Sequence, residues 1–208
     1  TAHGSASRLR IEAQQLARIE QTVPEPSDVG LGAQLNDFWA AWDDVANNPG
    51  NMAGRIAVLQ QASTVASSLH RVDGELRGLR DSAVGGLESL VAEVNSLAGN
   101  IAELNAAVSR AVGAGLVQHD LADQRDELVL QLSKKIGITT TPGELGTVDV
   151  MLGGSSLVRG ARAQSLQLAE PEPLGPPHAA TGLARVELQW AIDGYPATVT
   201  SGEVAGLL

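Results

Sequence analysis

The chain has 208 residues, a formal net charge of −10, 43% hydrophobic residues and only 2% aromatic residues. A core built from aliphatic side chains suits helix packing better than a large ligand pocket, and an excess of 24 acidic over 14 basic residues argues against nucleic-acid binding. The absence of cysteine excludes disulfides and cysteine-ligated metals, and no apolar run approaches the roughly 20 residues of a membrane span.

Two helices are predicted first along the chain. The first, residues 5–21, places apolar residues at spacings of three and four, and a Pro-Glu-Pro run at 24–26 stops it. The second, residues 30–48, follows Ser27 or Asp28 as its N-cap. It ends at an Asn-Asn-Pro-Gly turn.

A third predicted helix, residues 52–112 with Asn51 as its N-cap, carries the strongest pattern in the sequence. Its apolar residues alternate steps of four and three, apart from one stutter at Ala83 beside Gly85 and Gly86. Unbroken, this helix is on the order of 90 Å long. The alternative is a hairpin of two shorter helices broken at the glycines, but the stripe resumes on the same face after them, which favours continuity.

Eight apolar residues are predicted to carry the packing of these helices: Phe38, Trp39, Trp42, Leu69, Leu76, Leu90, Leu97 and Leu104. We interpret the three aromatic residues as the place where the second helix packs on the third, because aromatics are scarce and each buries roughly 150–250 Å². Truncation of Trp39 or Trp42 to alanine is then expected to cost about 3–5 kcal/mol.

A fourth helix is predicted from Asp120, as its N-cap, to about Ile136, with Gly137 as its stop. The apolar period then changes to two, which predicts short strands separated by glycine or proline. These strands are residues 138–141, 147–152, 156–159, 165–168, 184–192 and 197–200. A β-turn is expected at 153–156, a tight hairpin turn at 193–194, and a loop or crossover at the proline-rich residues 170–177.

These elements predict an α+β fold. An elongated bundle of long antiparallel helices, residues 1–137, includes one very long heptad-patterned helix and forms a helical rod domain. A smaller, mostly antiparallel β domain, residues 138–208, follows it. The stripe of the long helix cannot be buried alone, so it needs the other helices or other chains as partners.

No set of side chains points to catalysis, a cofactor or a metal. The four histidines share no short motif with a carboxylate: His3, His70, His119 and His178. The acidic residues of the fourth helix are better explained by capping and the helix dipole than by chemistry: Asp120, Asp123, Asp126 and Glu127, with Arg125 among them. We therefore expect no enzyme.

Several short segments, taken in order, resemble the family of flagellar hook-associated protein 1, the hook–filament junction proteins. The segments are 25–31 (EPSDVGL), 35–42 (LNDFWAAW), 46–49 (ANNP), 94–98 (VNSLA), 101–105 (IAELN) and 120–128 (DLADQRDEL). The closing residues 201–208 are similar to the glycine-rich stretch from which the family's chain turns back into its C-terminal helices. The resemblance is strongest over residues 5–137, and in the β region only the order of elements matches.

The resemblance implies a structural, non-enzymatic component of the bacterial flagellum. Such a protein is exported, lies outside the cell, and joins hook to filament by packing against copies of itself in an axial ring, the hook protein and an adjoining junction protein. It also implies that this sequence is a central part without the family's terminal helices. No cofactor, nucleic acid, membrane or small-molecule substrate is implied.

A second hypothesis is a soluble coiled-coil adaptor or dimerisation module whose β domain binds a ligand. It requires a stable dimer at low concentration, whereas the isolated junction fragment should be monomeric or weakly associating. Equilibrium ultracentrifugation separates the two.

Overall fold

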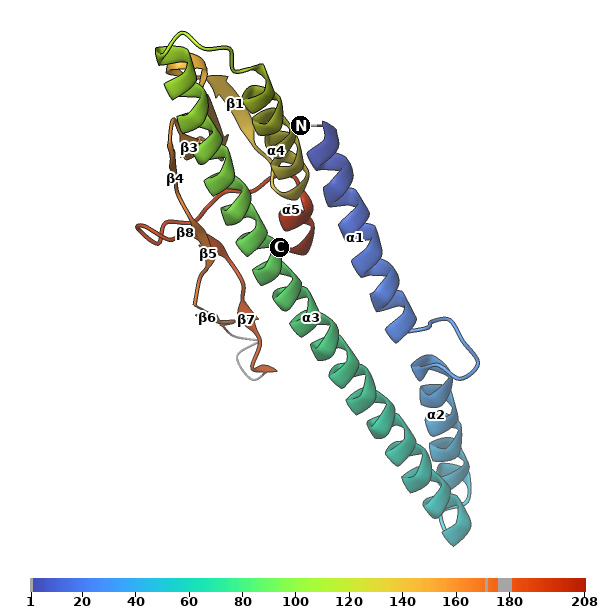
Figure 1. The fold of residues 1–208 in the computed structure, drawn as a ribbon. Coiled ribbons are helices and arrows are strands. Elements are labelled where there is room, and N and C mark those ends of the chain that lie inside the picture. Colours follow the sequence, from blue (N-terminus) through green and yellow to red (C-terminus); the bar gives the residue numbers. More distant parts are fainter. Residues whose placement is uncertain (1, 171, 176–180) are drawn as a thin grey trace. The chain divides into compact units, whose positions relative to one another are not determined.

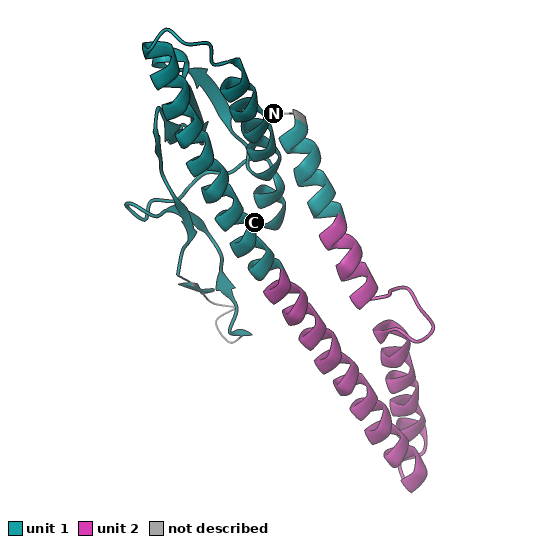
Figure 2. Cartoon of the chain, viewed as in Figure 1, with its two compact units in different colours: residues 1–13, 83–208 teal, residues 14–82 magenta. Residues whose placement is uncertain are grey.

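The computed structural model describes residues 2–170, 172–175 and 181–208, and the chain divides into two compact units (Figure 2). Unit 1 comprises residues 1–13 and 83–208, and unit 2 comprises residues 14–82. Four helices form the first two thirds of the chain: α1 (Ala2–Thr22), α2 (Leu31–Asn47), α3 (Met52–Gly113) and α4 (His119–Lys135) (Figure 1). None of the helices in the described residues is long and apolar enough to cross a membrane.

The start of α2 differs from the prediction, because neither Ser27 nor Asp28 caps it. Gly30 is the N-cap and provides no side chain. Instead, the carboxylate of Glu25 accepts a hydrogen bond from the Gly32 N–H at 3.0 Å. A carboxylate at this end is favoured by the positive pole of the helix dipole. Glu25 therefore provides the N-terminal hydrogen bond that was expected from Ser27 or Asp28.

α3 is a single helix, as the continuous stripe predicted, and the alternative hairpin broken at Gly85 and Gly86 is not formed. Its start is as predicted, since Oδ1 of Asn51 accepts a hydrogen bond from the Ala53 N–H at 3.0 Å. Its end is closed by Gly115 in the left-handed region with φ of +68°, in the arrangement that lets following N–H groups bond back to the last helical carbonyls.

α4 begins without a side-chain cap. Gln118 is the N-cap residue, and Asp120 lies within the first turn, so the predicted capping role of Asp120 is wrong. Its carboxylate still lies where the helix dipole favours negative charge.

The β region consists of short antiparallel strands (Figure 1). β1 (Thr139–Pro142), β2 (Val148–Leu152), β3 (Ser155–Arg159) and β4 (Arg162–Ala163) form one sheet in that order, with the 3-10 turn η1 (Glu144–Gly146) between β1 and β2. β5 (Leu166–Leu168) pairs with β8 (Leu188–Trp190), and β6 (Glu172–Pro173) pairs with β7 (Ala184–Arg185). The short helix α5 (Glu203–Leu207) follows.

Most predicted strands are observed, with two corrections. The stretch 184–192 is two short strands, and residues 197–200 form none. The turn between β2 and β3 is confirmed: Gly153 and Gly154 have φ values of +55° and +89°, as a two-residue hairpin loop with two positive φ angles requires. The predicted loop or crossover at 170–177 is wrong at residues 172–173, which form β6. Residues 171, 176 and 177 lie outside the described residues, as does His178.

Unit 1 has one hydrophobic core to which helices and strands both contribute. Its fully buried members include Leu87, Val94 and Ile101 of α3, Leu132 at the end of α4 with Ile136 just beyond it, Val150 and Leu152 of β2, Leu157 and Val158 of β3, and Val204 of α5. The α+β class is confirmed. The division between the units, however, does not fall at residue 137 as predicted, because the strands share their core with the second half of α3 and with α4.

Candidate interaction surfaces

An apolar groove lies between α2 and α3 within unit 2. It has a volume of about 210 Å³ and is lined by Leu35, Phe38, Ala62, Val65, Ala66 and Leu69. No residue of α2, all of which is described, is fully buried. Two of the predicted packing residues, Phe38 and Leu69, line this groove, and Leu69 is 49% exposed.

Trp39 and Trp42 are not buried against α3, so the prediction for them is wrong in this chain. Their side chains are 58% and 53% exposed, and each contacts Phe38, with ring centroids 5.1 Å and 6.3 Å apart respectively. Residues at i and i+1 of a helix point about 100° apart, so Trp39 does not share the direction in which Phe38 faces the groove. Leu35, Trp39 and Trp42, at steps of four and three, form an apolar stripe along α2, which we call the tryptophan stripe. Leu35 also lines the groove, whereas the two tryptophans are more than half exposed.

We expect that truncation of Trp39 or Trp42 to alanine lowers the free energy of unfolding of this chain by at most about 1 kcal/mol, because more than half of each side chain stays in water. Phe38→Ala is the matched control and should lower it by about 2–3 kcal/mol, because Phe38 is half-buried in the groove. Urea unfolding monitored by circular dichroism measures the change. A loss above about 3 kcal/mol for either tryptophan would restore the original prediction.

The other predicted packing residues, all on α3, differ in burial. Leu76 is 37% exposed, Leu90 and Leu104 are half-buried, and Leu97 is buried. In unit 1, Leu97 belongs to the core and Leu90 packs against it, and the packing role of the set stays a prediction.

Two asparagines of α3, not singled out from the sequence, attach the strands to the helix. The Asn105 amide is fully buried: Nδ2 donates to the carbonyl oxygens of Val148 and Gly160, both at 2.8 Å, and Oδ1 accepts from the Val148 N–H at 3.0 Å. Asn95 makes the same two-sided contact with the N–H and carbonyl of Leu166, both at 2.8 Å. The sequence carries one indication of this role: each asparagine directly follows an apolar position of the heptad pattern of α3, Val94 or Leu104.

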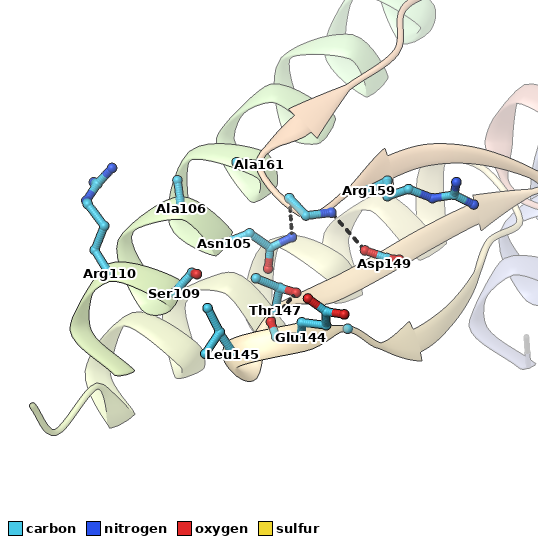
Figure 3. A pocket seen from close by; sticks show the side chains of 12 residues that line it. Asn105, Ala106, Ser109, Arg110, Glu144, Leu145, Thr147, Asp149, Arg159 and Ala161 are labelled. Atoms are coloured by element: carbon cyan, nitrogen blue, oxygen red, sulfur yellow. Dashed lines mark hydrogen bonds between the residues drawn. The ribbon is translucent and has the colours of Figure 1, made fainter. Parts of the chain in front are cut away.

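A recess of about 580 Å³ opens beside Asn105 (Figure 3). Its rim carries both signs of charge, from Arg110, Arg159, Glu144 and Asp149. One oxygen of Asp149 is occupied by the Gly160 N–H, at 2.8 Å. The lining pairs no nucleophile with a base, and no group of three metal-ligating side chains occurs among the described residues.

Arg125, within the acidic stretch of α4, is only 5% exposed. Its guanidinium pairs with the carboxylate of Asp126 at 2.9 Å and donates to the carbonyl of Gly146 at 2.7 Å. The bond to Gly146 fastens α4 to the turn between β1 and β2, while Asp126 pairs with the guanidinium from the next position of the same helix.

Lys135 at the end of α4 lies between the carboxylates of Glu93 and Glu203, at 3.1 Å and 3.2 Å. Partial burial alone would lower the pKa of Lys135, but its hydrogen bonds to the two carboxylates outweigh that effect and raise the pKa. Because the pKa is higher in the folded state, the ammonium stabilises the fold fully below the unfolded pKa of about 10.4. This contribution is lost as the pH rises through the folded pKa.

We therefore expect the difference in unfolding free energy between wild type and Lys135→Gln to be constant from about pH 6 to pH 9 and to shrink above about pH 10.5. Urea unfolding at a series of pH values measures it. A difference that persists unchanged into strongly alkaline solution would contradict the role given to this ammonium group.

Comparison with known proteins gives consistent results. Residues 16–208 match the family model described as the flagellar hook-associated protein FlgK helical domain. The chain is 31% identical over 168 residues to flagellar hook-associated protein 1 of Salmonella typhimurium and 28% identical over 144 residues to that of Bacillus subtilis, covering 79% and 69% of this chain. It spans only 30% and 28% of the length of these two relatives.

Among solved structures, the chain is similar to the flagellar hook junction protein FlgK from Burkholderia pseudomallei. The TM-score is 0.83 at 24% sequence identity, and the match covers 99% of this chain and 37% of that one. At this identity the likeness demonstrates a shared fold.

Proposed function

Because the chain belongs to the flagellar hook-associated protein FlgK family, whose helical-domain model it matches over residues 16–208, we propose that it is a structural part of a bacterial flagellum that joins hook to filament by subunit packing. The relatives are named hook-associated and hook junction proteins. Their names favour this function over the soluble adaptor. In this proposal the protein acts outside the cell and catalyses no reaction.

The observation that carries the proposal is the tryptophan stripe beside the apolar groove. The chain contains three tryptophans, and two of them lie more than half exposed on one helix, while the core of unit 1 is mainly aliphatic. Exposed tryptophans next to an apolar groove are typical of surfaces that bind another polypeptide, where a few aromatic side chains supply most of the binding energy.

The partners we propose are other copies of the protein in an axial ring, the hook protein and an adjoining junction protein. Packing of this kind needs complementary surfaces and a stable fold but no reactive group. The carboxylates, arginines and asparagines described above are engaged in holding elements of the fold together, which agrees with this requirement.

The proposal is tested by deleting the gene in the organism that encodes the protein and restoring it at full length. Deletion should leave hooks without filaments in electron micrographs and abolish swimming, and the wild-type gene should restore both. Normal filament numbers in the deletion strain would overturn the proposal.

A double variant, Trp39→Ala with Trp42→Ala, tests the stripe in the same strain. It should restore swimming poorly although the protein is made and folded. The matched control replaces Ile192 and Tyr195, which are also exposed, at 76% and 71%, but lie in the β region. If both double variants swim equally well, the tryptophan stripe is not the surface that binds the partner.

A further inference from the structure

The first half of α1 is held by a segment almost two hundred residues away in the sequence, residues 200–206. The N–H of Gly202 donates to the carbonyl of Gly4 at 2.9 Å, and the Arg8 guanidinium donates to the carbonyl of Thr200 at 3.2 Å. All of these residues lie in unit 1.

Glu203 joins this contact to the rest of unit 1 by charge. One carboxylate oxygen accepts from Arg10 of α1 at 2.6 Å, and the other accepts from Lys135 of α4 at 3.2 Å. Lys135 is also paired with Glu93 of α3 at 3.1 Å. The side chain of Glu203 is only 16% exposed. A carboxylate that binds two cations where water is largely excluded forms stronger hydrogen bonds than an exposed pair.

Small residues let the two segments approach closely. A Cβ at Gly206 would lie 2.8 Å from Cβ of Ile11 and 2.9 Å from the carbonyl oxygen of Arg8. A Cβ at Gly4 would lie 3.1 Å from both the Ser133 carbonyl and the Ser201 hydroxyl. The surfaces of α1 and residues 200–206 are therefore in direct contact at these two glycines.

The core of unit 1 does not depend on α1. Its buried members and the partly buried residues packed against them come from α3, α4, the β region and α5, and no α1 residue occurs among them in the described part of the chain. Leu9, on the first half of α1, is 64% exposed. The attachment of this half-helix in unit 1 therefore consists of polar contacts and the approach of Ile11 to Gly206, outside the apolar core.

We propose that residues 200–206 act as a clasp for α1, with Glu203 as its positioning residue, so that residues 2–13 have a docked state and a released state while the core of unit 1 stays folded. In this proposal, the first half of α1 docks on unit 1 only when residues 200–206 are in their folded position. This proposal rests on the contacts within unit 1 and holds whether or not the proposed flagellar function does.

Hydrogen exchange of the whole chain, measured by mass spectrometry, tests the clasp. Glu203→Gln keeps the shape of the side chain and removes its charge. We expect amide exchange in residues 2–13 to accelerate about tenfold, with no change in residues 94–108 of α3. Glu187→Gln is the matched control, because Glu187 also pairs with an arginine, Arg185 at 3.2 Å, but lies exposed in the β region.

Arg10 provides a second, milder test because it is 61% exposed and its replacement leaves the core untouched. Arg10→Gln should also accelerate exchange in residues 2–13, and Arg10→Lys, which keeps the positive charge, should largely preserve the protection. Acceleration that spreads equally to residues 94–108, or unchanged exchange in residues 2–13 of the Glu203 and Arg10 variants, would overturn the clasp.

Discussion

Replacement of Gly202 by alanine is expected to destabilise unit 1 by about 3 kcal/mol or more. Gly202 has a φ of +91°, and a Cβ there would lie 2.6 Å from Cα of Ile136, 2.7 Å from its nitrogen and 2.7 Å from the Lys135 carbonyl oxygen. These are all backbone atoms, which cannot move aside by changing a rotamer. Backbone strain and steric overlap therefore act together at this one position.

Gly154 is a close control for this substitution. Its φ is +89°, nearly the same, but no atom lies within 4 Å of a Cβ built there. Gly154→Ala should cost about 1 kcal/mol, from the positive φ alone. Urea unfolding of the two variants separates the cost of the positive φ from the cost of the steric overlap. If both variants lose the same free energy of unfolding, the close approach of Gly202 to Ile136 contributes nothing.

Replacement of Asn105 by leucine should lower the free energy of unfolding by about 3–5 kcal/mol. Leucine has a similar size, but it cannot satisfy the Val148 N–H or the carbonyl groups of Val148 and Gly160 that bond to the asparagine. Each buried backbone group left without a partner costs about 1–3 kcal/mol. The loss comes from polar groups stranded between α3 and the sheet.

The control for this variant is Asn100→Leu, on an exposed position of the same helix, which should change stability by less than about 0.5 kcal/mol. Asn105→Asp adds a further distinction: it retains an acceptor for the Val148 N–H but turns a carboxylate oxygen towards two carbonyl oxygens, so it should also destabilise strongly. Wild-type stability of Asn105→Leu in thermal and urea unfolding would contradict the assigned role.

The helices were predictable because their signals are local. α2 was expected over residues 30–48 and is observed as Leu31–Asn47, since its apolar spacing and the Asn-Pro-Gly turn after it act over a few residues. The same is true of Asn51 as a cap and of the glycine pair at 153–154 as a hairpin loop. The prediction of a strand at 197–200 was wrong because an alternating apolar pattern does not by itself provide a partner strand.

The candidate surface could be predicted only in part. Phe38, Trp39 and Trp42 were recognised as a group, but the sequence assigns all three to one packed face, and the structure leaves the two tryptophans exposed. Which side of a two-sided apolar helix meets its neighbour depends on where the neighbour lies. Asn95, Asn105 and Glu203 were missed for a related reason, since their partners lie at sequence separations of 71, 43 and 193 residues.

The sequence by itself determined the element order, the α+β class, the long helix α3 and the family, because periodicity, turn residues and short motifs are read along the chain. Only the tertiary structure decided that the strands share a core with α3 and α4, that asparagine side chains bind strand backbones, and that residues 200–206 hold α1. These features depend on contacts between distant segments, whose burial and hydrogen bonds exist only once the chain has folded.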